Sequence, residues 1–193
     1  MANLDRTVAG SLEIVATFTL YFVALGVSQL FPSLLLGNVS FLLYLPAGIK
    51  LLSILVFGWR GAVGIVLAIF VRLLTKDGTY LVLESLEMAL INAGVSWAVI
   101  YGFLRAFKIS SNLYNLNLWH IVGLSAVCSV TNGLLFSWLL VGFNHLGAEL
   151  YWHKVLMIVL GNFTGNAVLV WLMTYFSRHR LMLQNRLLKF RQH

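Results

Sequence analysis

Long runs of apolar residues occupy most of this chain, and they limit what it can fold into. Six runs, separated by short turns or by one polar loop, are found at residues 12–31, 34–57, 61–74, 80–103, 118–143 and 155–176. A helix of about 20 apolar residues crosses the roughly 30 Å of hydrocarbon in a bilayer. Only 10% of the residues are charged, against about 25% in soluble domains. The sequence therefore predicts an all-α polytopic integral membrane protein with about six transmembrane helices in contact with the lipid bilayer.

The chain divides into a predicted transmembrane domain, residues 1–176, and a basic C-terminal tail, residues 177–193. In the tail, Leu183, Leu187 and Phe190 recur at helical spacing and would share one face of a helix. The last span either continues into water as a basic helix, or this face lies on anionic lipid or docks a partner protein.

The distribution of Lys and Arg predicts the orientation. With six spans, nine of the 13 basic residues fall on the side that holds both termini, three fall on the other side, and Lys50 lies within a span. Basic residues are enriched in cytoplasmic loops. Both termini are therefore expected in the cytoplasm.

Lys50 is the most unusual charge, because it lies near the middle of the second run. It precedes Arg60 by ten residues, which is about 15 Å along a helix. Three roles are open to its side chain: an ion pair within the protein, extension to the membrane interface, or binding of a ligand. Glu87 in the fourth run is its predicted ion-pair partner. Glu84, on the same helix face as Glu87, is expected to pair with Arg72 or Lys76.

Asparagines form a second group of polar residues at membrane depth. Asn162 and Asn166 share a face of the sixth run, and Gly161 and Gly165 form a G-x-x-x-G pattern that allows close helix packing. With Asn92 and Asn132 from neighbouring runs, these amides either bond between helices or complete a site for a small polar ligand.

Pro46 and Gly48 interrupt the apolar character of the second run. Proline removes a backbone hydrogen bond and kinks a helix interior. We expect either a packing kink or a broken helix of the kind that lines transporter sites.

Several functional classes find little support. The basic residues form no patch interleaved with aromatics, so nucleic-acid binding is not expected, and neither a catalytic motif nor a cofactor motif is present. The protein is therefore expected not to be an enzyme. His145, Glu149 and His153 have a spacing that would suit a metal on one helical face, but this small set is weak support and no metal site is predicted.

Two segments resemble the MASE1 family of membrane sensory domains. The stretch LPAGIKLLSILVFGWRG contains Pro46, Gly48, Lys50, Gly58 and Arg60, and the stretch WHKVLMIVLGNFTGN contains Trp152, Gly161, Asn162 and Gly165. The first is similar to an early P-x-G-x-[RK] turn of that family, and the second to its closing L-G-[DN]-x-x-G motif. The resemblance implies a multi-pass sensory module of the bacterial inner membrane.

The sequence thus favours a ligand-sensing or accessory membrane module that acts through a membrane protein partner or as a homo-oligomer. A substrate-binding subunit of a transporter, of the energy-coupling-factor type, is the alternative. A third possibility is a structural subunit of a larger membrane complex, in which the internal charges only specify packing.

Overall fold

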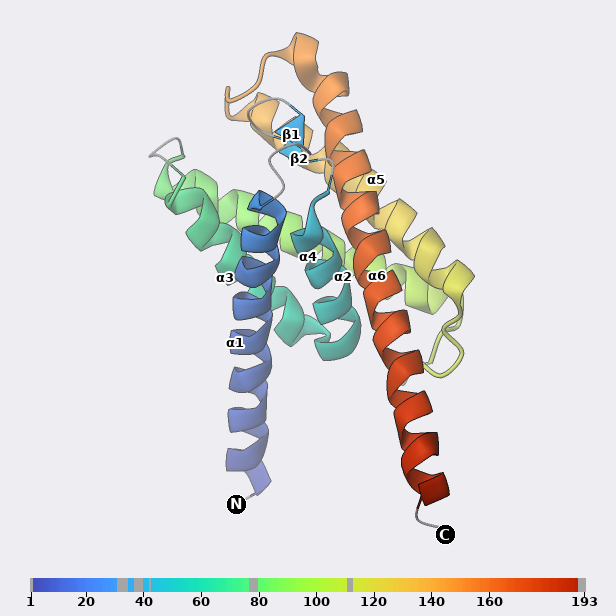
Figure 1. Cartoon of the computed structure of the whole chain (residues 1–193). Helices are drawn as coiled ribbons and strands as arrows, with labels where there is room; N and C mark the ends of the chain where they lie inside the picture. Colours follow the sequence, from blue (N-terminus) through green and yellow to red (C-terminus); the bar gives the residue numbers. More distant parts are fainter. Residues whose placement is uncertain are drawn as a thin grey trace.

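The computed structural model describes residues 2–30, 35–36, 40–41, 43–76, 80–110 and 113–190, with side chains for residues 8–30, 43–76, 80–110, 113–173 and 175. The chain is predominantly helical (Figure 1). In order, its elements are α1 (Ala2–Gln29), β1 (Leu35–Leu36), β2 (Ser40–Phe41), α2 (Leu45–Phe57), α3 (Trp59–Leu74), α4 (Val82–Ala106), α5 (Leu118–Gly142), the 3-10 helix η3 (Ala148–Leu150) and α6 (Tyr151–Phe190). The two short strands pair antiparallel.

Four of the helices are long and apolar enough to cross a membrane. The segments are Val8–Gln29, Val82–Ala106, Leu118–Gly142 and Ala148–Met173. Many large apolar side chains on these helices are exposed, including Leu12, Leu90 and Trp138, as expected of surfaces that face lipid. This is a multi-pass membrane protein in its architecture. The remaining two apolar runs form shorter helices.

The second predicted span differs from the expectation at its start. Residues 34–57 were expected to form one span, but α2 begins only at Leu45. Pro46 lies in the first turn of α2, where the missing N–H has no helical partner to lose. The proline therefore starts a helix, and the predicted kink or break inside a helix is wrong.

A tight turn at Gly58 joins α2 to α3. Gly58 has φ +59° and ψ −130°, a backbone conformation that residues with a Cβ rarely adopt. The 13 residues of α2 extend about 20 Å and the 16 residues of α3 about 24 Å. Both lengths are below the thickness of the hydrocarbon core, so the count of six full spans stays a prediction.

The short helix α2 lies in the centre of the bundle. It packs against α1, α3, α4 and α6, and eight of its residues, Lys50 among them, are buried. Non-helical backbone and polar groups at membrane depth are tolerated where protein surrounds them. The central position of α2 explains how its irregular start and its lysine are accommodated.

Close packing of α2 on α6 depends on small residues. A methyl group added at Gly165 would overlap the backbone carbonyl of Tyr44, and one added at Gly48 would lie 2.9 Å from the carbonyl oxygen of Gly165. The backbone N–H of Tyr44 donates to the carbonyl of Gly161 at 3.0 Å. The two glycines predicted for helix packing thus lie where the start of α2 meets α6.

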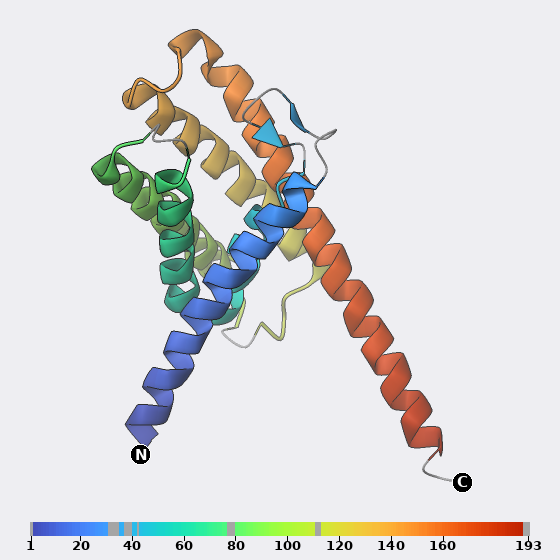
Figure 2. The same ribbon diagram turned by 60° about the vertical axis from the view of Figure 1, so that its left-hand side comes forward.

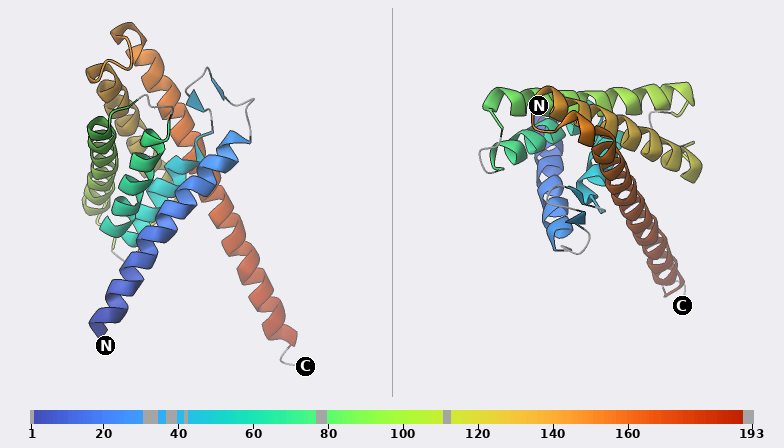
Figure 3. Two further views of the ribbon diagram at one scale, coloured as in Figure 1. Left: turned by 90° about the vertical axis from the view of Figure 1, so that its left-hand side faces the viewer. Right: turned by 90° about the horizontal axis from the view of Figure 1, so that it is seen from above.

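Both termini lie on the same side of the molecule, and α1 and α6 diverge toward them (Figure 2). Seen from above, α4 runs along one edge of the molecule and α6 extends away from it toward the C-terminal end (Figure 3). On the terminal side, Arg60 pairs with Glu13 of α1 at 3.0 Å. Helix α6 continues to Phe190, so the predicted basic tail begins as an extension of the last helix. The side chains of Leu183, Leu187 and Phe190 lie outside the described part.

Candidate functional site

A cavity of about 130 Å³ lies in the centre of the bundle, and all six helices or the residues that flank them contribute to its wall. Tyr21 comes from α1 and Lys50 from α2. The polar lining residues are Tyr21, Tyr44, Lys50, Arg72, Lys76, Tyr80, Asn92, Asn132, Lys154 and Asn162. Four of these side chains are cationic and, among the described residues that line the cavity, none is acidic.

The inner end of the cavity holds what we call the lysine–amide cluster: Lys50, Asn92 and Asn132. The Nζ of Lys50 donates to the Oδ1 of Asn92 at 3.0 Å and to the Oδ1 of Asn132 at 2.9 Å. The Nδ2 of Asn92 also donates to the Oδ1 of Asn132 at 2.8 Å. An ammonium group has only donors, so the amide oxygens must face it. The cluster ties α2 to α4 and α5.

The predicted pairing of Lys50 with Glu87 is wrong. Glu87 is exposed on α4, whereas Asn92 and Met88 of the same helix are buried. Within the described part of the chain, Lys50 forms no ion pair with any carboxylate. Its charge is met by amide oxygens alone, although a lysine at this depth normally has an acidic partner.

Toward the other end lies the arginine–tyrosine cluster: Arg72, Tyr21 and Tyr44. The guanidinium of Arg72 donates to the hydroxyl of Tyr21 at 3.2 Å and to the hydroxyl of Tyr44. It also lies over the ring of Tyr44, 5.1 Å from the centroid, which adds a cation–π contact. The two hydroxyls are 2.7 Å apart. These contacts hold the guanidinium group in place and connect α3 to α1 and to the start of α2.

Asn162 and Asn166 lie side by side on α6 but in different surroundings. Asn162 lines the central cavity, is 3% exposed and bonds no described residue through its side chain. Asn166 donates to the hydroxyl of Ser129 at 3.4 Å, while its Oδ1 has no partner in the described structure. Asn162 therefore belongs with the cavity, and Asn166 lies one turn further along the helix.

Glu84 lies near the start of α4, and the structure describes no ion pair between it and either predicted partner, Arg72 or Lys76. Its carboxylate contacts the Nε2 of His145 at 3.2 Å and accepts the backbone N–H of Leu81 at 3.1 Å. Arg72 instead bonds the two tyrosines because they lie on the elements packed beside α3. The ring of Tyr80 packs edge-on against His145, with centroids 4.5 Å apart. Burial raises the pKa of the Tyr80 phenol, so it stays neutral at this end of the cavity.

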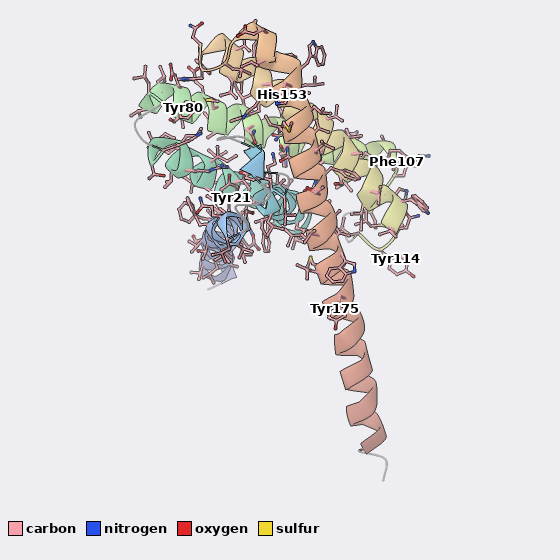
Figure 4. All side chains as sticks on the ribbon, turned by 45° about the horizontal axis from the view of Figure 1, so that its top comes forward. Tyr21, Tyr80, Phe107, Tyr114, His153 and Tyr175 are labelled. Atoms are coloured by element: carbon pink, nitrogen blue, oxygen red, sulfur yellow. The ribbon has the colours of Figure 1, made fainter. Side chains whose placement is uncertain are left out.

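The histidine spacing noted in the sequence does not form one helical face. His145 precedes η3 and contacts Glu84, whereas His153 lies in α6. Among the described residues, no group of three His, Cys, Asp or Glu side chains is placed to hold a metal ion. Figure 4 shows His153 and Tyr80 toward one end of the bundle, with Tyr175 far along α6 toward the other.

The remaining hydrogen-bonding capacity of Lys50, Arg72 and the two amides lies mainly with donors. The Oδ1 of Asn132 already accepts from both Lys50 and Asn92, whereas Lys50 keeps an N–H and both amides keep N–H groups. Arg72 uses only its Nη1 toward described residues. Carboxylate and phosphate oxygens are the acceptors that such groups bind best. The cavity is therefore chemically suited to an oxygen-rich anion.

The structure thus brings together four of the residues named from sequence, Lys50, Asn92, Asn132 and Asn162, and separates Glu84 and Glu87 from them. Sequence reasoning missed the tyrosines that hold Arg72. A tyrosine in an apolar run is a weak signal, because Tyr is also common at membrane interfaces.

The chain matches no protein-family model, and comparisons with curated proteins and with solved structures also gave no match.

Proposed function

We propose that this protein is a non-enzymatic integral membrane module that binds a small anionic molecule in its central cavity. One observation carries the proposal: Lys50 and Arg72, two cations on the cavity wall, are held by amide oxygens and phenol hydroxyls and form no ion pair with a described carboxylate. Buried cations at membrane depth are expensive unless an opposite charge or strong acceptors meet them. A bound anion supplies that charge, and the spare N–H groups of both clusters would bond its oxygens.

The positions of the cations support access from the predicted outer side. Lys76 is exposed at the end of α3, and Lys154 lies in the first turn of α6. These residues line the same cavity as Lys50. Cationic groups along a narrow opening raise the local concentration of anions. A ligand would thus pass Lys76 and Lys154 before it reaches Lys50.

The consequence of binding is proposed to be transmitted to a membrane protein partner or to a second copy of the chain. Anion binding would draw together the helices that the two clusters connect and also α6, which lines the same cavity with Lys154 and Asn162 and whose cytoplasmic extension is proposed to report the change. This agrees with the sensory role that the MASE1-like segments suggest. The proposed location is the bacterial inner membrane, with both termini in the cytoplasm.

Native mass spectrometry tests the binding proposal. The full chain, purified in a mild detergent, is measured alone and after addition of inorganic phosphate, sulfate or adipate. We expect an anion to be retained by the wild type and lost in Lys50→Met. Arg105→Gln is the matched control, because it also removes one positive charge but from an exposed position. Wild-type protein that retains no anion, or equal retention by Lys50→Met, would contradict the proposal.

A transport subunit is the second candidate, because a central cavity to which all helices contribute is also what substrate capture requires. Uptake into proteoliposomes separates the two roles. Binding without any movement of the anion across the membrane, with or without an added ATPase partner, favours the sensory or accessory role.

A further inference from the structure

The order of side chains along each helix divides the central cavity into layers. On α2, Tyr44 at the helix start is followed by Ala47 and then Lys50, and all three line the cavity. One helical turn separates each from the next. Along this wall the lining changes from polar to apolar and back to polar.

The α6 wall repeats this order in full, and the α5 and α3 walls each show part of it. On α5, Leu140 lies nearest the outer cations, followed toward Lys50 by Phe136 and then by the amide of Asn132. On α6, Lys154 is followed by Ile158 and then Asn162 at steps of four residues. On α3, Arg72 lies outward of Ile69. An outer cationic layer and an inner lysine–amide layer are thus separated by apolar side chains.

The two polar layers lie too far apart for one small anion to bind both. Tyr44, which contacts Arg72, and Lys50 are six residues apart, which is about 9 Å along a helix. Lys154 and Asn162 are eight residues apart on α6, which is about 12 Å. A single carboxylate can accept N–H groups at one layer only.

We propose that the natural ligand of this cavity is a small molecule with an anionic group at each end and an apolar segment between them. This rests on the proposed function and specifies its ligand. One end accepts from Lys50 and the amides of the inner layer, and the other end binds beside Arg72 and Lys154. The apolar segment lies against Phe136 and Ile158, where a polar group would lose its hydrogen bonds with water.

The apolar layer also explains selectivity. Inorganic phosphate and sulfate bind in only one layer and leave the cation of the other layer, Lys50 or Arg72, without a bound anion. An anion with an apolar chain and no second charge gains the apolar contact but not the second ion pair. Only a molecule charged at both ends satisfies both layers at once.

Isothermal titration calorimetry on the full chain in detergent tests this inference at constant ionic strength. The ligands are the dicarboxylates succinate, adipate, suberate and sebacate, and the monocarboxylates of matching length, butyrate, hexanoate, octanoate and decanoate. We expect affinity to pass through a maximum at an intermediate chain length. At that maximum the dicarboxylate should bind at least about tenfold more tightly than the monocarboxylate of the same length, the factor that corresponds to about 1.4 kcal/mol.

Two variants test which side chains bind the two anionic ends of the ligand. Lys50→Met should weaken the best dicarboxylate by about tenfold or more, and Arg72→Gln should do the same from the other layer. Because Arg72→Gln also removes contacts with two tyrosines, its fold is checked by thermal melting. The chain-length series on the wild type decides the question even if this variant does not fold.

Equal affinities for adipate and hexanoate, with both lost in Lys50→Met, would overturn the two-ended ligand and leave a site for a single anion, so the proposed function would survive. Failure of every dicarboxylate to bind, while phosphate or sulfate binds, would have the same meaning. A copurifying anionic phospholipid that no dicarboxylate displaces would also overturn the inference.

Discussion

At the scale of single residues, Lys50 decides the character of the site. Its ammonium group is held by two amide oxygens, at 3.0 and 2.9 Å, and by no described carboxylate. The Oδ1 of Asn132 accepts hydrogen bonds from both Lys50 and Asn92. The hydrogen bonding of the lysine–amide cluster therefore depends on Asn132. Amide oxygens stabilise the cation without neutralising it, so the positive charge stays available to a ligand.

Asn132→Leu should therefore destabilise the protein. It removes the acceptor of two hydrogen bonds and leaves Lys50 with one partner, which should cost about 1–3 kcal/mol. Thermal melting of the purified protein in detergent measures the change. Ser137→Ala on the same helix is the control, because the Ser137 hydroxyl is buried and has no partner in the described structure. A melting temperature that falls equally in both variants would refute the role of Asn132.

At the scale of secondary-structure elements, the helices follow from the apolar runs, and the errors arise where local signals are ambiguous. Four runs form long helices because their length and hydropathy both fit a membrane span. The second run was misjudged because Pro46 breaks a helix interior but also favours the first turn. Composition alone does not distinguish these positions, since the preceding residues are apolar as well.

Pro46→Ala should consequently have only a moderate effect. The proline lies at the start of α2, so its replacement restores no missing hydrogen bond and straightens no kink. Because the buried Pro46 side chain loses two methylene groups, we expect a decrease in unfolding free energy of about 1–2 kcal/mol, measured by thermal melting, and anion binding that is retained. A larger loss of stability, or the loss of anion binding, would mean that the proline has a role beyond starting the helix.

Gly165→Ala should be strongly destabilising because its methyl group would overlap the backbone carbonyl of Tyr44. Neither backbone can move without separating α2 from α6, and overpacking of this kind costs about 1–3 kcal/mol. Gly94→Ala in α4 is the matched control, since nothing lies within 4 Å of an added Cβ there. The control should be neutral or stabilising, because alanine favours helices. A stable Gly165→Ala protein with unchanged anion binding would argue against the tight α2–α6 contact.

At the scale of the whole molecule, the sequence predicts which polar residues are unusual but not all of their partners. Lys50 and the amides were identified because polar groups in lipid need partners. Glu87 was misassigned because the rotation of α4 about its axis is set by packing, which buries Asn92 and exposes Glu87. The Arg72–tyrosine contacts join three elements that are distant in sequence, so no local pattern predicts them.

The predicted topology has a direct test in cysteine labelling. Cys128 is the only cysteine and is buried, so a Cys128→Ala background is suitable. Glu149→Cys should react with a membrane-impermeant maleimide on intact cells, because its loop is predicted to lie outside. Asn115→Cys, also exposed, should react only after permeabilisation. The reverse labelling pattern would mean that the orientation of the protein in the membrane is opposite to the prediction and that the cavity opens to the cytoplasm.

The proposed function rests on an anion that binds in the central cavity at the lysine–amide cluster. Anomalous X-ray diffraction from crystals of the full chain grown with selenate locates such an anion directly, since selenium marks its position. We predict an anomalous peak inside the cavity, within hydrogen-bond distance of Lys50, that is absent from crystals of Lys50→Met. Peaks confined to surface basic residues, with none in the cavity, would contradict the account.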